Sequence, residues 1–448
     1  MKRNSFLKNG IGIGAGSFGA AMISSMVTSF FAFYLTDIMY LGAGIVGIIL
    51  AVSAVVDGIT DFGMGVLEDN TNSRWGKARG WILVFALPYA MSAALLFVLP
   101  ASFGAQAKLI YVCVTYTLYC LFHTVVALPV NTLTSLVTSD MKERAVFSTI
   151  TMFFSMATGM IVSLGLSSLL DKMGGGAHGY RGAAILFAVI GTVFLFICVF
   201  CVREKRISSK KEPFSRKEMA RQLRALFSNK YWWLMNLCAT FNSFGFMIIT
   251  SMQTYYCQYI LGDFSKIGVV FSCATLSQMI AMPFCAPVIA RFGKKKTVIG
   301  SGLLSLLGYA IILLNTADFR FLCVGLIVRG VLFAPVNACE AAFFADTVDY
   351  GEYRNGVRQD GLVFSVKATL NKIVGSLITA GLGFALQFSG YSGALETQPA
   401  QALATIKWLF LLGPIVAYTL CIISYFLMDL DKKMPQILET LENRHAQS

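Results

Sequence analysis

Long apolar runs alternate with short polar stretches along almost the whole chain. Each run is long enough to cross a bilayer as a helix, since a spanning helix needs about 20 apolar residues. Twelve such runs are present, near residues 10–36, 43–67, 81–100, 109–137, 146–169, 182–202, 231–260, 266–290, 297–314, 320–344, 364–389 and 405–428. The pattern predicts an all-α membrane protein with twelve transmembrane helices.

Three short motifs recur in the second half of the chain at similar offsets, of 217, 206 and 222 residues. The pairs are Arg74–Lys77 with Arg291–Lys294, Pro129–Asn131 with Pro335–Asn337, and Phe33–Leu35 with Tyr255–Cys257. Repeats in register predict two pseudo-symmetric six-helix bundles, the layout of a major facilitator transporter. The expected parts are a bundle over 1–202, a cytoplasmic linker over 203–230, a bundle over 231–428 and a cytoplasmic tail over 429–448.

The basic residues are unevenly distributed between the two sides of the predicted spans. Six lie in odd-numbered gaps and three lie inside spans, which leaves 27 of the 36 Lys and Arg for the N-terminus, the even-numbered gaps and the tail. By the positive-inside rule, both termini are expected in the cytoplasm. The linker is the most basic gap, and residues 215–227 are expected to form an amphipathic helix at the lipid surface, not a nucleic-acid site.

Two acidic residues interrupt the second apolar run. Asp57 and Asp61 are four residues apart, so a helix places them on one face. A charged side chain at the bilayer centre costs roughly 2.5–3.5 kcal/mol on insertion scales. A pair of carboxylates therefore indicates a site for a cation or a proton. The alternative is a packed helix in which one carboxyl is protonated and the other is bonded to backbone.

The motifs around these acids resemble those of one transporter family. The second run reads Asp57-Gly-Ile-Thr60-Asp61-Phe62-Gly-Met-Gly65 and is followed by Arg74-Trp-Gly-Lys77. Further matches are Tyr34–Asp37, Asp140–Arg144 and Ala345–Glu352. The chain resembles the glycoside–pentoside–hexuronide:cation symporters, typified by the bacterial melibiose permease. Phe62 stands where that family usually has proline.

The resemblance implies a site for the coupling cation. In the family, the aspartate pair binds Na⁺, H⁺ or Li⁺ with help from the residue before the second aspartate and a threonine in the fourth span. The corresponding residues here are Asp57, Thr60, Asp61 and Thr124. Carboxylate and hydroxyl oxygens suit a hard cation, and the two aspartates would be the metal ligands if the ion is Na⁺. A proton suits the carboxylates as well, and Na⁺ is the preferred interpretation.

The substrate side differs from the melibiose permease. The carboxylates that hold galactosides there correspond to Ala21 and Ala127, and a neighbouring tryptophan corresponds to Asn131. The chain instead carries three bases within spans, Arg329, Lys367 and Lys372. This exchange favours an acidic sugar such as a hexuronide. The alternative is structural: Arg329 pairs with Glu340, and Lys372 neutralises Asp57 and Asp61.

Charged residues at the ends of the fourth and tenth spans suggest a cytoplasmic gate. Pseudo-symmetry would bring these two ends together in the outward-facing state. The residues are Lys142, Arg144, Asp346, Asp349 and Glu352. The alternative is a set of solvated loop charges, for which each ion pair contributes about 0–1 kcal/mol.

These features predict a multi-pass protein of the cytoplasmic (inner) membrane that is a secondary transporter and not an enzyme. It would couple Na⁺ or H⁺ entry to uptake of a sugar or glycoside by alternating access. We expect no cofactor beyond the coupling ion, no nucleic-acid partner, and a monomer in the lipid bilayer. The alternatives are a symporter of a non-sugar organic anion or lipid-like solute, and a non-transporting membrane sensor of the same fold.

Overall fold

The computed structural model describes residues 2–71, 73–100, 102–138, 140–204, 216–356, 360–395 and 397–447. This part of the chain is helical and contains no strand. The helices are α1 (Lys2–Phe33), η1 (Tyr34–Ile38), α2 (Ala43–Asn70), α3 (Ala78–Leu96), α4 (Ala105–Val137), α5 (Met141–Lys172), α6 (Gly176–Cys201), α7 (Arg216–Phe227), α8 (Lys230–Tyr259), η2 (Phe264–Lys266), α9 (Ile267–Ala281), η3 (Met282–Phe284), α10 (Cys285–Phe292), α11 (Lys294–Leu314), α12 (Phe319–Asn355), α13 (Asp360–Phe388), α14 (Ala400–Leu427) and α15 (Leu430–Gln447).

Twelve spans in the described residues are long and apolar enough to cross a membrane, which confirms the predicted number. One of them is interrupted. The span Phe264–Phe292 consists of α9 and α10 joined by the single 3₁₀ turn η3. Pro283 lies in this turn and Pro287 follows in α10. A proline lacks the N–H that continues an α-helix, so the helical ladder breaks there.

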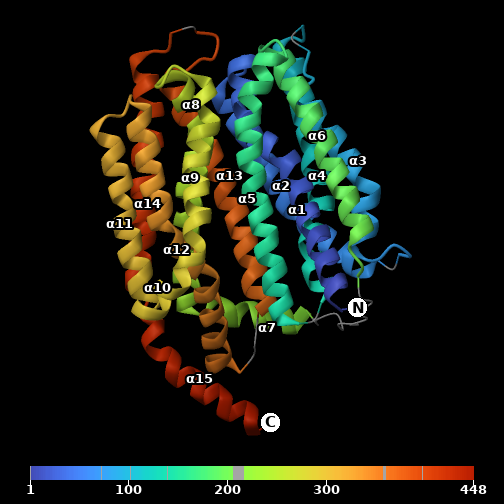
Figure 1. Cartoon of the computed structure of the whole chain (residues 1–448), viewed down its shortest axis with the longest axis vertical. Helices are drawn as coiled ribbons and strands as arrows, with labels where there is room; N and C mark the ends of the chain where they lie inside the picture. Colours follow the sequence, from blue (N-terminus) through green and yellow to red (C-terminus); the bar gives the residue numbers. More distant parts are fainter. Residues whose placement is uncertain are drawn as a thin grey trace. The chain divides into compact units, whose positions relative to one another are not determined.

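The chain forms two compact units whose boundaries cross the sequence repeats. The first comprises residues 1–209, 250–272 and 379–406. The second comprises residues 210–249, 273–378 and 407–448. The first unit therefore contains the first six spans together with the ends of helices from the second repeat. Figure 1 shows its long helices α1, α3, α4, α5 and α6 running alongside one another.

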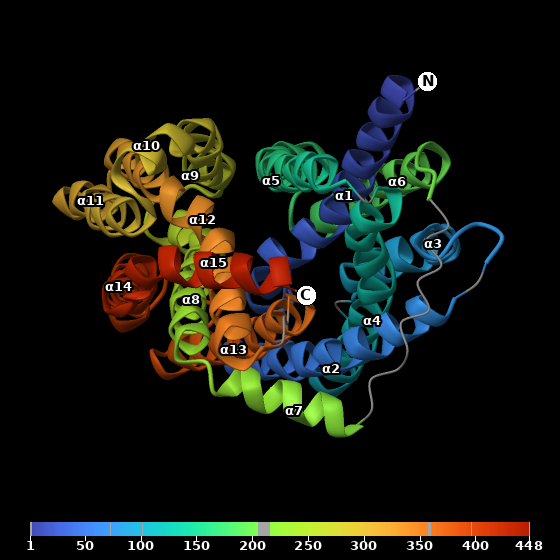
Figure 2. The same ribbon diagram turned by 90° about the horizontal axis from the view of Figure 1, so that it is seen from below.

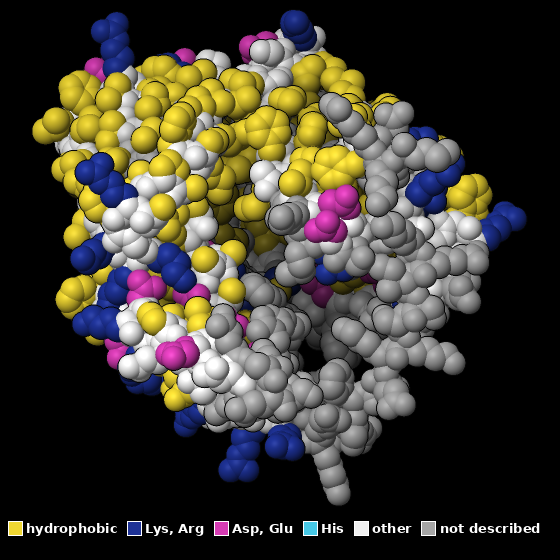
Figure 3. Space-filling model, turned by 60° about the horizontal axis from the view of Figure 1, so that its bottom comes forward, with side chains coloured by type: hydrophobic (Ala, Val, Ile, Leu, Met, Phe, Trp, Pro, Cys, Tyr) yellow, Lys and Arg dark blue, Asp and Glu magenta, His cyan; other side chains and the backbone are white. Residues whose placement is uncertain are grey.

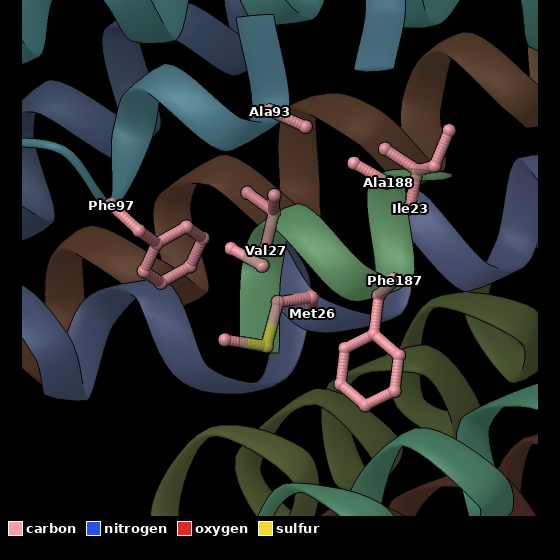
Figure 4. A pocket seen from close by; sticks show the side chains of 8 residues that line it. Ile23, Met26, Val27, Ala93, Phe97, Phe187 and Ala188 are labelled. Carbon is pink, nitrogen blue, oxygen red and sulfur yellow. The ribbon is translucent and has the colours of Figure 1, made fainter. Parts of the chain in front are cut away.

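The first unit is held together by close helix contacts and by apolar side chains. Gly19 of α1 faces α6, where an added Cβ would lie 2.5 Å from the carbonyl oxygen of Gly191. Such small residues let helix backbones approach, and this contact drives association within lipid. Nearby, α1, α3 and α6 enclose a narrow apolar gap lined by Ile23, Met26, Val27, Ala93, Phe97, Ala184, Phe187 and Ala188 (Figure 4). The gap offers no polar group to a ligand.

The second unit shows the same packing principle. An added Cβ on Gly308 of α11 would overlap the carbonyl oxygen of Gly325 on α12. The predicted amphipathic segment forms α7, which lies across the direction of α8 in Figure 2. Asn355 donates a hydrogen bond to the carbonyl of Ala225, which ties α12 to α7. The predicted tail is itself a helix, α15, and Lys433 on it donates to the Tyr231 hydroxyl.

Hydrophobic and basic side chains occupy different parts of the surface. In Figure 3, hydrophobic side chains cover the upper part of the face, and Lys and Arg side chains gather in its lower part. Exposed large apolar residues such as Leu314, Phe388 and Phe426 are 68–79% exposed. Exposed apolar helices are expected where lipid replaces water as the solvent. The orientation of the termini stays a prediction.

Candidate functional site

The aspartate pair lies on α2, against α4. Thr124 of α4 donates its hydroxyl toward Oδ1 of Asp57 at 2.5 Å and toward Oδ1 of Asp61 at 3.0 Å. Thr124 is buried, and both aspartates are half-buried. The four-residue spacing places both carboxylates on the face of α2 that meets α4. The structure thus brings together three of the four residues expected to bind the cation.

The fourth residue, Thr60, makes a different contact. Its hydroxyl donates to the backbone carbonyl of Asp57 at 2.9 Å, one turn earlier in the same helix. This hydrogen bond occupies its proton and leaves the oxygen lone pairs available as acceptors. Thr60 can therefore offer an oxygen to a cation but no proton to the carboxylates.

This arrangement is suited to binding a cation or a proton. A hydroxyl has a single hydrogen, so Thr124 can donate to one carboxylate at a time, although oxygens of both lie within reach. Two carboxylates close enough to share one donor repel each other when both are ionised. A bound cation or proton relieves this repulsion. Every atom in the set is oxygen, the ligand type preferred by hard cations.

A polar cavity lies further along α4, between α1 and α5. It is lined by Ser17, Ala20, Ala21, Ser24, His123, Ala127, Val130, Asn131, Thr151 and Ser155. His123 precedes Thr124 in the chain, so the cavity and the aspartate pair share α4. The structure places Asn131, Ala21 and Ala127 in this cavity, and the role of Asn131 in substrate binding stays a prediction.

Several cavity residues were missed by the sequence reasoning. His123, Thr151 and Ser155 carry no motif, and only the packing of α1, α4 and α5 brings them together. Thr151 Oγ1 is buried and has no hydrogen-bond partner among the described residues. Ser17 donates to the carbonyl of Ile13 at 3.0 Å, which leaves its lone pairs for a ligand. A helical-face analysis of α5 could have grouped Thr151 with Ser155, which are four residues apart.

Two intramembrane bases of the second unit, Arg329 and Lys367, have partners within that unit. Lys367 of α13 forms an ion pair with Glu340 of α12, with 2.7 Å between Nζ and Oε1. Glu340 also accepts a hydrogen bond of 2.9 Å from the Asn242 amide of α8. The alternative in which Arg329 pairs with Glu340 is wrong, because Lys367 reaches Glu340 from α13. Lys372 is half-buried one to two turns further along α13.

Arg329 lies among aromatic rings instead. Its guanidinium donates to the Tyr418 hydroxyl at 2.6 Å and lies 5.0 Å from the ring centroid of Tyr418 and 5.5 Å from that of Phe333. Its exposed fraction is 5%. An added Cβ on Gly308 of α11 would lie 2.7 Å from the Cβ of Arg329. Arg329 therefore packs where α11, α12 and α14 meet.

The gate residues make contacts inside their own units. Arg144 donates from Nε to the carbonyl of Thr138 at 2.8 Å, just past the end of α4. Asp346 accepts a hydrogen bond from Lys294 of the repeated Arg-Phe-Gly-Lys motif. Glu352 is buried and Asp349 is half-buried on α12. The side chain of Lys142 lies outside the described residues. The gate stays a prediction.

A second cluster of polar residues joins both repeats within the first unit. Asp37 of η1 accepts hydrogen bonds from Tyr259 at 2.5 Å and from Tyr391 at 2.6 Å. Thr36 lies 3.0 Å from the Tyr255 hydroxyl. Burial raises the pKa of Tyr391, so its phenol stays protonated and donates. The motif at Tyr34–Asp37 gave no sign of these tyrosines, because they come from the other half of the chain.

Comparisons with known proteins agree with this architecture. Residues 12–432 match the family described as MFS/sugar transport protein. The chain is 31% identical to the putative glycoside/cation symporter YagG of Escherichia coli strain K12, over 92% of this chain and 89% of the relative. It is 30% identical to the isoprimeverose transporter of Lactiplantibacillus pentosus, over 96% and 90% of the two chains. The solved structure of the nucleoside transporter NupG has 13% identity, covers 94% of this chain and 100% of its own, and superimposes with a TM-score of 0.65.

The fold and the paired carboxylates define a secondary transporter of the major facilitator type, not an enzyme. The chain belongs to the MFS/sugar transport family, among the glycoside–pentoside–hexuronide:cation symporters. It is a multi-pass inner-membrane protein that carries out cation-coupled sugar symport.

Proposed function

We propose that Asp57, Asp61 and Thr124 bind the coupling ion, that this ion is Na⁺, and that its entry drives uptake of a sugar held in the cavity between α1, α4 and α5. The observation that carries the proposal is the single Thr124 hydroxyl within reach of both carboxylates. Thr60 contributes a hydroxyl oxygen from the next turn of α2. A bound Na⁺ would compensate the negative charge of the two carboxylates.

The shared helix α4 supports a route for coupling. Thr124 contacts Asp57 on the side of α4 that faces α2. On the same helix, His123, Ala127 and Asn131 line the cavity. Fixing α4 through Thr124 positions the cavity residues, so ion and sugar would each raise the affinity for the other.

Binding of the ion can be tested separately from binding of the sugar. We expect NaCl to raise the melting temperature of the purified protein above that in matched KCl, and Asp57→Asn and Asp61→Asn to remove this difference. In vesicles, both variants should lose accumulation of labelled methyl glycosides driven by a Na⁺ gradient. Asp171→Asn is the matched control, because Asp171 is an exposed acid on α5.

Two results would reject the assignment. Normal Na⁺-dependent stabilisation and accumulation in both aspartate variants would show that the ion binds elsewhere. Accumulation that is driven by a pH gradient and unaffected by Na⁺ would show that the coupling ion is a proton, bound at the same carboxylates.

A further inference from the structure

We propose that the transported sugar is neutral and that the structure selects against acidic sugars. This inference rests on the proposed function, because it concerns the sugar that binds beside the cation site. The inference differs from the acidic sugar that the sequence favoured. It is based on the chemistry of the cavity in the first unit and on the contacts that the basic residues of the second unit make.

The described lining of the cavity in the first unit offers hydrogen-bonding groups of the kinds that bind sugars. Its described lining contains hydroxyls from Ser17, Ser24, Thr151 and Ser155, the amide of Asn131 and the imidazole of His123, and no Asp, Glu, Lys or Arg. A hydroxyl or an amide both donates and accepts, which matches a sugar hydroxyl. An ionised carboxylate placed there would be desolvated without a counter-charge, at a large cost.

The unpartnered Thr151 hydroxyl supports a hydroxylated ligand. Buried hydroxyls are normally hydrogen-bonded, and an orphaned one needs a partner that the described protein does not supply. A sugar hydroxyl can donate to it or accept from it. Ala127 on the facing helix α4 lines the cavity with only a methyl group.

The corresponding face of the second unit carries an ion pair and, further along α13, the half-buried Lys372. The sequence repeat relates α8, α12 and α13 to α1, α4 and α5, and it relates Asn337 to Asn131. On that face, the Asn242 amide donates to Asn337 and to Glu340, each at 2.9 Å. Lys367 is 2.7 Å from Glu340, so the charge of one compensates that of the other. The ion pair with Glu340 reduces the positive charge that Lys367 could offer to an anion.

Arg329 does not supply the missing positive charge. Its described contacts are with Tyr418 and Phe333 in the packing between α11, α12 and α14. Of those helices, only α12 is the counterpart of a cavity-lining helix, and the Arg329 side chain lies where α12 packs against α11 and α14. Two of the three bases that favoured an acidic sugar therefore have structural partners.

The test compares methyl β-glucoside, methyl β-xyloside and methyl β-galactoside with methyl β-glucuronide, in Na⁺ and at pH 7. We expect at least one neutral glycoside to bind ten or more times as tightly as the glucuronide. Thr151→Val should weaken neutral-sugar binding at least threefold, while Thr151→Ser should retain it. Lys367→Gln combined with Glu340→Gln should not create a preference for the glucuronide.

The failures of the two proposals are distinguishable. The glucuronide could bind more tightly than its neutral counterpart, lose that advantage in Lys367→Gln or Lys372→Gln, and still be accumulated with Na⁺. This result would overturn the neutral-sugar inference alone. Neutral-sugar binding that does not depend on Na⁺, Asp57 or Asp61 overturns the proposed coupling site and leaves the substrate class intact. Failure to bind any of the four glycosides overturns the inference drawn from the cavity.

Discussion

At the scale of single residues, Thr124 is the residue on which the proposed cation site depends. Its hydroxyl lies within 3.0 Å of oxygens from both Asp57 and Asp61. Its side chain is buried, so water cannot easily take its place. A hydrogen bond to a charged group contributes about 1.5–3 kcal/mol, more than a neutral hydrogen bond.

We expect Thr124→Val to lower the apparent Na⁺ affinity by roughly ten- to hundredfold, because valine keeps the shape and removes the hydroxyl. Thr124→Ser keeps the hydroxyl and should change the affinity by less than about fivefold. The Na⁺ concentration that gives half-maximal sugar uptake measures both. An unaltered Na⁺ dependence in the valine variant would remove Thr124 from the site.

At the scale of elements, an acid at the end of α6 fixes the start of α3. Glu204 accepts hydrogen bonds from the backbone N–H groups of Lys77 at 2.6 Å, Ala78 at 3.2 Å and Arg79 at 2.8 Å. An anion is favourable at a helix N-terminus, where these N–H groups lack partners in the helix. Gly76 has φ +109°, and an added Cβ would lie 2.6 Å from the Glu204 carboxylate. The glycine of the repeated motif is required by this contact.

We expect Glu204→Ala to destabilise the protein by about 1–3 kcal/mol, since the variant leaves three helix N–H groups without their acceptor. The melting temperature should fall by several degrees. Glu439→Ala is the control, because Glu439 is an exposed acid on α15. Equal melting temperatures for the two variants would mean that water replaces Glu204 at no cost.

At the scale of the whole molecule, alternating access requires the ends of the two repeats to separate and rejoin. Asp37 belongs to the first repeat, and its donors Tyr259 and Tyr391 belong to the second. Gly393 of the second repeat approaches so closely that an added Cβ would overlap the carbonyl oxygen of Thr36. Asp37 lies in the π-helical turn η1, a distortion that is frequent at functional sites.

We expect Asp37→Asn to loosen this end of the bundle, because two charge-assisted hydrogen bonds become neutral ones. Backbone hydrogen exchange should accelerate severalfold in residues 253–260 and 386–395. Tyr391→Phe should have the same effect to a smaller extent, since it removes one donor. Asp263→Asn is the control at the same end of α8, where the Ser265 hydroxyl lowers the pKa of an exposed acid. Exchange rates in Asp37→Asn that match the control would exclude this role.

The sequence alone determined the number of spans, the two repeats and the presence of paired acids on one helical face. These features follow from local physics: a bilayer requires about 20 apolar residues for each helix, and a four-residue spacing fixes a shared face. The motifs around Asp57 and Asp61 also indicated the family before any geometry was known. The amphipathic segment before the seventh span followed from the same periodicity and forms α7.

Only the tertiary structure decided which polar groups meet. Lys367 pairs with Glu340, 27 residues away, and Arg329 meets Tyr418, 89 residues away. These pairings depend on how each helix is rotated about its axis and on which neighbours it packs against, and a hydrophobic run of spanning length leaves both undetermined. The same holds for Thr151 and His123, which become cavity residues only when α1, α4 and α5 assemble. Charged side chains can be counted in a sequence, but which opposite charge neutralises each of them depends on how the helices pack.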